Sequence, residues 1–236
     1  YDDQVDNFYV RALEATTDDS LSVEELIRWT MRTGDMSIAV MKKLDEANNE
    51  VYEHPSPHKV DVKIKKGPFI IVSGHDLRDL EQLLEQTEGK GINIYTHGEM
   101  LPSHGYPGLK KYPHLIGNYG GAWQDQQKEF DGIPGCILMT TNCLMRPRET
   151  YKDRIFTTNV VGWDGVINIP KGKDGKKDFT PIIEKALELG GFEEDQEPHE
   201  ITVGFGHHAT LSNAEAIVEA VKDGKIRHFF LIGGCD

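Results

Sequence analysis

Four side chains able to bind a metal each follow a short apolar run in the sequence. They are His75, Glu99, Cys143 and Cys235, which come after the runs 69–72, 92–95, 137–139 and 229–232. Imidazole, carboxylate and thiolate groups are common protein ligands of transition metals. Because the carboxyl ends of parallel strands meet at one edge of a sheet, we expect the four side chains to lie close together. Small residues precede them, so the backbone can approach a bulky group closely.

The mixture of ligand types favours iron over zinc. Thiolates are soft ligands that suit zinc, Cu(I) or iron–sulfur clusters, whereas a carboxylate is a hard ligand that suits an iron that also binds oxygen. A structural zinc site would favour paired cysteines about two to four residues apart. Here Cys136 and Cys143 are seven apart and Cys235 is remote. The residues therefore predict iron in a mixed sulfur and oxygen environment.

Other polar residues near these positions have weaker signals. Cys136 lies within an apolar run, which predicts an inert, buried thiol. The residues before Cys143 are candidates for hydrogen bonds around a metal, and they are Thr140, Thr141 and Asn142. Nearby histidines are expected in loops with solvent-exposed or structural roles, and they are His97, His104 and His114.

The first part of the chain is predicted to be helical. Apolar residues recur at steps of three and four along residues 23–44, and Ser22 followed by Glu25 is a capping-box pattern. Two prolines within residues 54–58 then force extended backbone and indicate a linker. We therefore expect residues 1–58 to be a helical segment, the end of a helical domain.

From about residue 60, short apolar runs alternate with helical stretches. Predicted strands are 69–72, 92–95, 137–139, 166–169, 201–205 and 229–232, and predicted helices are 76–87, 179–189 and 211–223. This alternation predicts an α/β fold, in which the N-terminal helices precede a Rossmann-like, mostly parallel sheet domain over residues 59–198. Residues 199–236 would begin a second α/β domain. The lysine-rich residues 170–177 predict a solvated loop.

The composition excludes several classes of partner. The 236 residues carry a formal net charge of −13, which argues against binding to nucleic acid or to an anionic membrane surface. No apolar run approaches the ~20 residues of a membrane span. Three cysteines do not make a disulfide framework, so we expect a reducing cytoplasm. The chain begins at Tyr1 and ends directly after an apolar run, from which we expect a piece of a larger chain.

Four ordered motifs resemble those of a known family. They are Gly74-His75-Asp76-Leu77, Thr96-His97-Gly98-Glu99-Met100-Leu101-Pro102, Thr140-Thr141-Asn142-Cys143 and Gly233-Gly234-Cys235-Asp236. In motif order and spacing the chain resembles the hybrid cluster proteins, which are also called prismane proteins or hydroxylamine reductases. The resemblance covers nearly all of this chain, which would form less than half of a family member.

The resemblance implies two metal centres and an activity. One centre is a cubane iron–sulfur cluster, whose N-terminal cysteine ligands are absent from this sequence. The other is a hybrid iron–sulfur–oxygen cluster of the 4Fe-2S-2O type, where hydroxylamine is reduced to ammonia and water. Nitric oxide reduction in nitrosative stress defence is also linked with the family. The resemblance further implies a redox electron donor and ligands from the rest of the enzyme's chain, so we expect the isolated fragment to be inactive.

The resemblance also assigns roles to the candidate residues. Carried over by motif, His75, Glu99 and Cys143 would ligate the hybrid cluster, and Cys235 would bear an extra sulfur as a persulfide. Glu99 and Cys235 would act in catalysis. Three alternatives stay open: a carbon monoxide dehydrogenase-like redox metalloenzyme, a metal-free α/β binding module, and a zinc hydrolase. The glutamate within residues 96–102 favours the hybrid cluster proteins.

Overall fold

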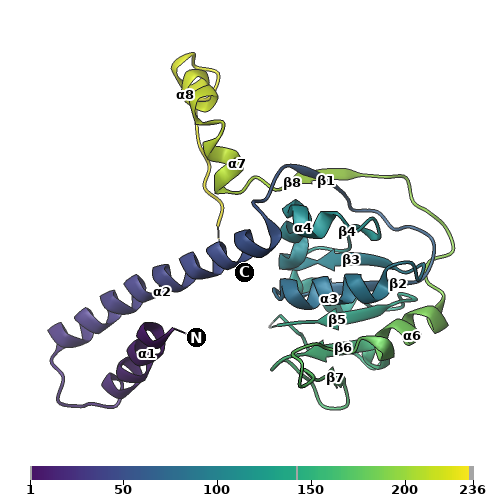
Figure 1. Ribbon diagram of the computed structural model, residues 1–236, viewed down its shortest axis with the longest axis horizontal. Coiled ribbons are helices and arrows are strands. Elements are labelled where there is room, and N and C mark those ends of the chain that lie inside the picture. The colour runs from purple at the N-terminus through teal and green to yellow at the C-terminus, as the bar shows by residue number, and fades with distance from the viewer. Residues whose placement is uncertain (1, 142, 234–236) are drawn as a thin grey trace. The chain divides into compact units, whose positions relative to one another are not determined.

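The computed structural model describes residues 2–141 and 143–233 (Figure 1). The chain divides into two compact units, Tyr1–Glu53 and His54–Asp236. The first unit is helical, and the second contains the sheet. None of the helices in the described part of the chain combines the length and hydrophobicity of a bilayer span.

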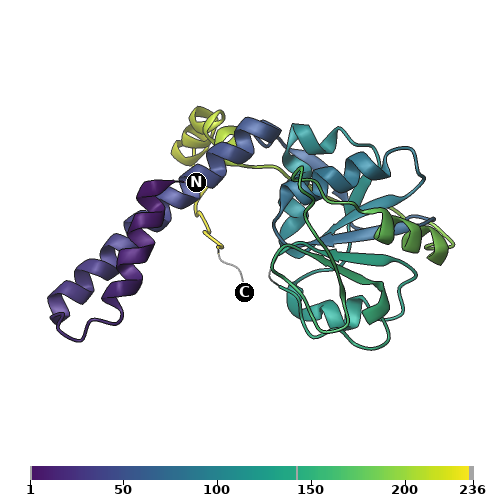
Figure 2. The ribbon, with the colours of Figure 1, turned by 60° about the horizontal axis from the view of Figure 1, so that its bottom comes forward.

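Two helices, α1 (Asp3–Ala15) and α2 (Val23–Tyr52), lie side by side in the first unit (Figures 1 and 2). The predicted capping box is confirmed, because the Ser22 side chain accepts the backbone N–H of Glu25 and the Glu25 carboxylate accepts that of Ser22. The predicted apolar residues lie on α2, but each is more than half exposed: Val23, Ile27, Met31, Ile38, Met41 and Leu44.

One eight-stranded sheet forms the second unit, in the order β7-β6-β5-β2-β3-β4-β1-β8. Its strands are β1 (His58–Asp61), β2 (Phe69–Ser73), β3 (Asn93–His97), β4 (Leu115–Asn118), β5 (Cys136–Met139), β6 (Ile155–Thr158), β7 (Ile167–Ile169) and β8 (Glu200–Val203). Among the described strands only β8 runs antiparallel to its neighbour. The predicted α/β fold with a mostly parallel sheet is therefore confirmed.

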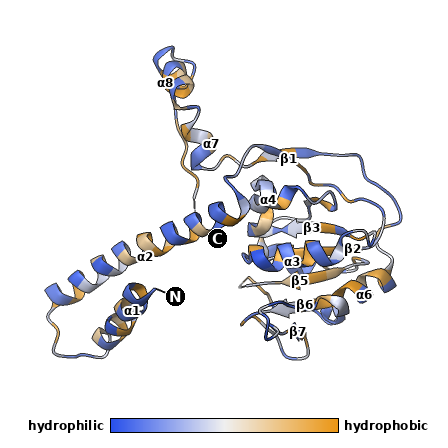
Figure 3. Cartoon of the chain, in the orientation of Figure 1, coloured by the Kyte–Doolittle hydropathy of each residue, from blue (hydrophilic) through white to orange (hydrophobic). Residues whose placement is uncertain are grey.

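The central strands are apolar because both of their faces are covered. All residues of β2 and β5 are buried, as continuous apolar runs predict for a parallel sheet. Alternate residues of these strands, Phe69, Ile71, Ile137 and Met139, share one cluster with Tyr95 and Phe130. β5 and α6 (Thr180–Leu189) are also among the most hydrophobic parts of the ribbon (Figure 3).

Helices connect the strands and cover the sheet. α3 (Leu77–Thr87) lies in front of the strands in Figure 1, and α6 packs against β2 and β5. Asp76 caps α3, because its Oδ1 accepts the backbone N–H of Asp79 at 2.9 Å. The shorter helical segments are η1 (Gly98–Gly105), α4 (Pro107–Lys110), η2 (Trp123–Asp125), α5 (Gln126–Glu129), η3 (Lys152–Arg154), α7 (His207–Leu211) and α8 (Ala214–Lys222).

The C-terminal segment differs most from the sequence-based expectation. The predicted strand 201–205 is β8, which pairs with β1 in the same sheet. In the described part of the last segment, residues 225–233, no strand forms, and the side chains of Phe229, Phe230, Leu231 and Ile232 are at least 73% exposed. The physical reason is that a strand needs a paired neighbour for its backbone hydrogen bonds. The predicted domain boundaries at residues 58 and 198 stay predictions.

Candidate metal centre

The strand order reverses between β2 and β5. From β2 the chain proceeds outward through β3 and β4, whereas β5 lies on the other side of β2 and leads outward through β6 and β7. In open parallel sheets, ligands commonly bind beyond the carboxyl ends of the strands at such a reversal. His75 follows β2, Glu99 follows β3 and Cys143 follows β5. The three described ligand candidates therefore surround the reversal point.

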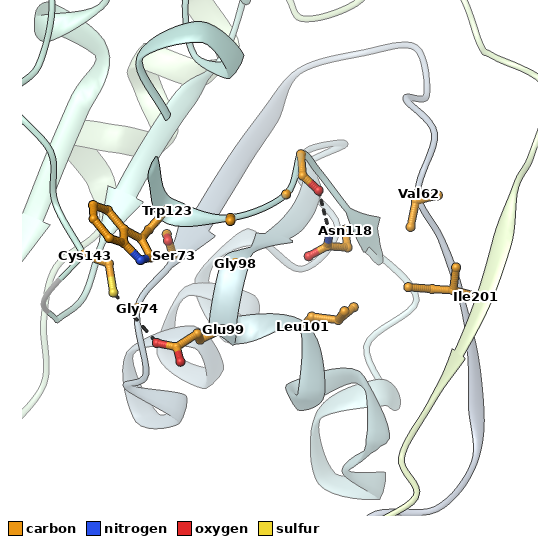
Figure 4. Close-up of a pocket in the computed structure, with 13 residues that line it drawn as sticks. Val62, Ser73, Gly74, Gly98, Glu99, Leu101, Asn118, Trp123, Cys143 and Ile201 are labelled. Carbon is orange, nitrogen blue, oxygen red and sulfur yellow. Dashed lines mark hydrogen bonds between the residues drawn. The ribbon is translucent and has the colours of Figure 1, made fainter. Parts of the chain in front are cut away.

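A cavity of about 460 Å³ opens at this edge of the sheet (Figure 4). Glu99 and Cys143 face each other at one end, with Trp123 beside Cys143, and Val62 and Ile201 lie at the other end. Several wall positions lack side chains, which brings the backbone to the cavity surface, and they are Gly74, Gly98, Gly120 and Gly121. The cavity thus joins a polar end, where Glu99 and Cys143 meet, to an apolar end.

Thr141 holds His75 at the end of β2. The Thr141 hydroxyl accepts the backbone N–H of His75 at 2.9 Å and lies 2.9 Å from Nδ1 of its ring. On the other side of the ring, Nε2 lies 2.5 Å from Oε2 of Glu99. The contacts of Thr141 are consistent with its predicted place beside the candidate ligands, and the Nε2 atom is directed at the carboxylate.

Glu99 connects the other two candidates. It is the second residue of η1 and follows Gly98, whose φ of +57° lets the chain turn sharply after β3. The same oxygen that contacts His75 also accepts a hydrogen bond from Sγ of Cys143 at 3.8 Å. Three side chains from three strand ends thus form one chain of contacts, from His75 through Glu99 to Cys143.

Cys143 has an unusual backbone conformation. Its φ is +71°, in the left-handed region that costs an L-residue about 1–2 kcal/mol. The buried side chain of Gln126 holds this turn, because its Nε2 donates to the carbonyl of Cys143 and its Oε1 accepts the N–H of Met145 at 3.2 Å. The sequence analysis missed Gln126, since a glutamine has no ligand signal and lies 17 residues from Cys143.

The remaining predicted residues differ in their placement. Cys136 is fully buried in β5, as predicted, and burial raises the pKa of its thiol to about 12. Cys235, the predicted persulfide cysteine, lies outside the described residues, as does Asn142. Three of the four candidate ligands can therefore be placed, and the role of all four stays a prediction.

The three described donors do not form a site for a single ion. Within the described residues, no group of three or more His, Cys, Asp or Glu side chains is gathered to hold one metal ion. A structural zinc ion needs about four ligands around one point, whereas these donors follow one another in a line of contacts, and two of them, Glu99 and Cys143, lie in the wall of a much larger cavity. The donor set fits a group that spans several ångströms and accepts both soft and hard ligands.

Gly74 lets the segment after β5 lie directly over the end of β2. Its φ is +105°, and a Cβ atom there would lie 2.5 Å from Oγ1 of Thr140 and 2.7 Å from the backbone nitrogen of Thr141. Only glycine fits this approach without displacing the segment. The close packing brings the residue after Gly74, His75, within reach of Thr141.

A buried histidine holds a second part of the cavity wall. Nδ1 of His97 lies 3.1 Å from Oγ of Ser73, and its Nε2 lies 3.0 Å from Oε2 of Glu129. The other carboxylate oxygen of Glu129 accepts the N–H of Gly121 at 2.8 Å. His97 is fully buried at the end of β3, so the expectation of a loop position was wrong, whereas the structural role is consistent with these contacts.

A polar network, which we call the Asn159 hub, links the segments beside this edge of the sheet, and within it Lys177 and Asp79 are buried whereas Asn159 is exposed. Lys177 pairs with Asp79 and donates to Oδ1 of Asn159 at 2.9 Å. Nδ2 of Asn159 donates to Asp76 at 3.0 Å and to the carbonyl of Thr140 at 2.8 Å. The predicted solvated loop is therefore wrong at its last residue, since Lys177 is only 7% exposed. Its charge is buried because a buried carboxylate neutralises it.

Comparisons with known proteins match the chain to one family and to curated relatives. The model of the Prismane/CO dehydrogenase family matches residues 1–236. Proteins named hydroxylamine reductase from Thermodesulfovibrio yellowstonii, Kosmotoga olearia and Zymomonas mobilis are 57%, 54% and 52% identical to the chain. In each case the match covers 100% of this chain and 42% of the relative. The chain thus spans less than half the length of the curated relatives it matches.

Proposed function

Because the chain belongs to the Prismane/CO dehydrogenase family, we propose that the whole protein is a hydroxylamine reductase and that this chain provides part of its cluster site. The observation that carries the proposal is the chain of contacts from His75 through Glu99 to Cys143 at the strand reversal, where Glu99 and Cys143 line one cavity. The names of relatives that are more than half identical support the same reaction.

The proposed ligands are the imidazole of His75, the carboxylate of Glu99 and the thiolate of Cys143, together with Cys235 as the persulfide. They would hold a hybrid iron–sulfur–oxygen cluster of the 4Fe-2S-2O type, and the rest of the enzyme's chain would supply the other ligands and the cubane cluster. When bound, the cluster supplies a Lewis-acidic iron and two electrons. With two protons, these convert hydroxylamine to ammonia and water as the N–O bond breaks.

The protein's own groups orient the reactants and handle protons. Oε2 of Glu99 lies within reach of both His75 and Cys143. When the Glu99 carboxyl group is protonated and not bound to iron, it can pass that proton to the departing oxygen as a general acid. Thr141 keeps the His75 ring in one orientation. Leu101, with the apolar far end of the cavity, reduces the access of water to the reacting atoms.

Metal analysis and turnover of the whole protein test the proposal. After anaerobic purification we expect stoichiometric iron with less acid-labile sulfide than iron, and hydroxylamine-dependent oxidation of a reduced viologen dye. Glu99→Ala should abolish this turnover in a folded protein, whereas Glu215→Ala, on the surface of α8, should not. A whole protein without iron, or full turnover in Glu99→Ala, would overturn the proposal.

The family description also contains carbon monoxide dehydrogenase, which is the second candidate. Carbon monoxide oxidation by the purified protein, without hydroxylamine turnover, would favour it. Nitric oxide reduction in nitrosative stress defence belongs to the main proposal and is tested by consumption of nitric oxide under the same conditions. We also propose a redox protein as electron donor and a reducing cytoplasm as the setting, in keeping with Cys136 and Cys143 not being joined in a disulfide.

A further inference from the structure

We propose that Gln126 is a positioning residue for Cys143, and that its buried amide holds residues 143–145 in the turn that presents the thiol to the cavity. The inference rests on the proposed role of Cys143 as a cluster ligand. Nothing in the motif around Cys143 points to Gln126, because the two residues meet only in the folded chain.

The backbone conformation of Cys143 has to be stabilised by other residues. Residues other than glycine rarely adopt positive φ, and those that do are mostly asparagine, aspartate or histidine. Cys143 has φ of +71° and is none of these three residue types. Such a conformation persists when the surrounding structure determines it, and it is frequent where function requires it.

The Gln126 amide supplies this stabilisation from both sides of the turn. Its NH₂ group donates to the carbonyl of Cys143, and its carbonyl accepts the N–H of Met145. A primary amide is the side-chain group that can donate and accept at once in this geometry. Gln126 is 1% exposed, so water cannot replace either bond, and losing them leaves buried backbone groups unpaired.

The position of Gln126 supports a role in the site. It is the first residue of α5, and the last residue of the same helix, Glu129, binds His97 and the N–H of Gly121. One short helix thus fixes the cavity wall at two places, the turn of residues 143–145 and the segment that contains Gly121. The side chain that fixes this turn acts on the backbone of a candidate ligand, so its loss should change the geometry of any bound iron.

The test uses the whole protein with Gln126→Met and Gln126→Glu. Methionine removes both hydrogen bonds, whereas glutamate keeps the size and the acceptor but loses the donor to the Cys143 carbonyl. Gln127→Met is the matched control, because Gln127 also bonds the backbone of this segment, at the Arg146 carbonyl, without contacting the turn. Glutamate also serves as the second variant if the methionine variant fails to fold.

Two readouts distinguish positioning from general stability. Crystal structures of the variants should show residue 143 outside the left-handed region, and the electron paramagnetic resonance signal of the cluster should change. Turnover should fall about 10–100-fold in kcat, as is usual when a group supporting a metal ligand is lost. Gln127→Met should keep both the signal and the turnover. An unchanged φ at residue 143 and an unchanged signal in both Gln126 variants would overturn the inference.

Failure of the proposed function would look different. Cys143→Ser tests the ligand role directly, since it should alter the cluster signal in a protein with Gln126 intact. If Cys143→Ser left the signal unchanged, the ligand assignment would fail, and with it the functional part of this inference. The backbone conformation in the Gln126 variants would still decide whether Gln126 holds the turn.

Discussion

Acid should destabilise the α/β unit through one buried histidine, His104. This residue of η1 is 2% exposed, and its Nε2 lies 2.9 Å from Oγ1 of Thr96. The Thr96 hydroxyl donates to Oδ1 of Asn118 at 3.0 Å, so its oxygen is available to accept a hydrogen bond from the ring N–H of neutral His104. Burial lowers the pKa of His104 to about 4, with a smaller effect from His58, because a buried positive charge is poorly solvated.

The sign and size follow from the difference between the folded and unfolded pKa values. An unfolded histidine titrates near pH 6.5, so between about pH 6.5 and 4 the unfolded chain binds more protons than the folded chain. The free energy of unfolding therefore falls as the pH falls through this window and keeps its full value above it. A shift of about 2.5 pH units at about 1.4 kcal/mol each corresponds to a loss of about 3 kcal/mol.

Urea titrations of the wild-type chain and of His104→Gln measure this loss. Glutamine does not titrate and can still bond the Thr96 hydroxyl, so carboxylates and other histidines contribute nearly equally to both proteins. We expect the wild type to lose about 3 kcal/mol more than the variant between about pH 7 and pH 4. Equal losses in the two proteins would show that His104 is not buried in its neutral form, and would refute the reasoning.

Three further predictions concern other buried groups. Lys177→Met leaves the Asp79 carboxylate, which is 1% exposed, without its cation. Urea titrations should show that the free energy of unfolding falls by about 3–5 kcal/mol. A fall below about 1 kcal/mol would contradict this. Gly74→Ala places a Cβ 2.7 Å from a backbone nitrogen, whereas Gly89→Ala has open space at φ +71°. The Gly89 variant should lose about 1 kcal/mol of unfolding free energy, and the Gly74 variant should lose more. Equal losses in the two variants would count against the close packing. Cys136, with its pKa raised to about 12, should resist iodoacetamide in the folded chain and react after unfolding, and rapid reaction in the folded chain would argue against its burial.

The central strands could be predicted from the sequence because their own residues require burial. β2, β3 and β5 begin and end within two residues of the apolar runs that predicted them. β4 and β6 were missed, since β4 contains Gly117 and Asn118 and β6 ends in two threonines. Gly117 makes sense only in the folded sheet, where a Cβ would meet the carbonyl of Asp61 on β1. Pairing with neighbours, rather than local hydrophobicity, makes these segments strands.

The candidate site was predictable to a similar extent. The rule that ligands gather at the carboxyl ends of parallel strands predicted that His75, Glu99 and Cys143 lie together, and their contacts agree with it. Gln126 and Lys177 could not be found in this way. Glutamine and lysine are usually exposed, and only tertiary packing reveals that these two are buried.

The Asn159 hub has a consequence for how this edge of the sheet opens. One amide joins the turn before α3, the first turn of that helix and the end of β5, while Lys177 adds the segment before α6. Opening the first turn of α3 or the segment before α6 alone would leave Asp79 or Lys177, both buried, without its opposite charge. These two segments should therefore exchange their amide hydrogens in one cooperative event rather than by separate fraying. The turn that follows His75 would then be held by groups that lie outside the candidate site itself.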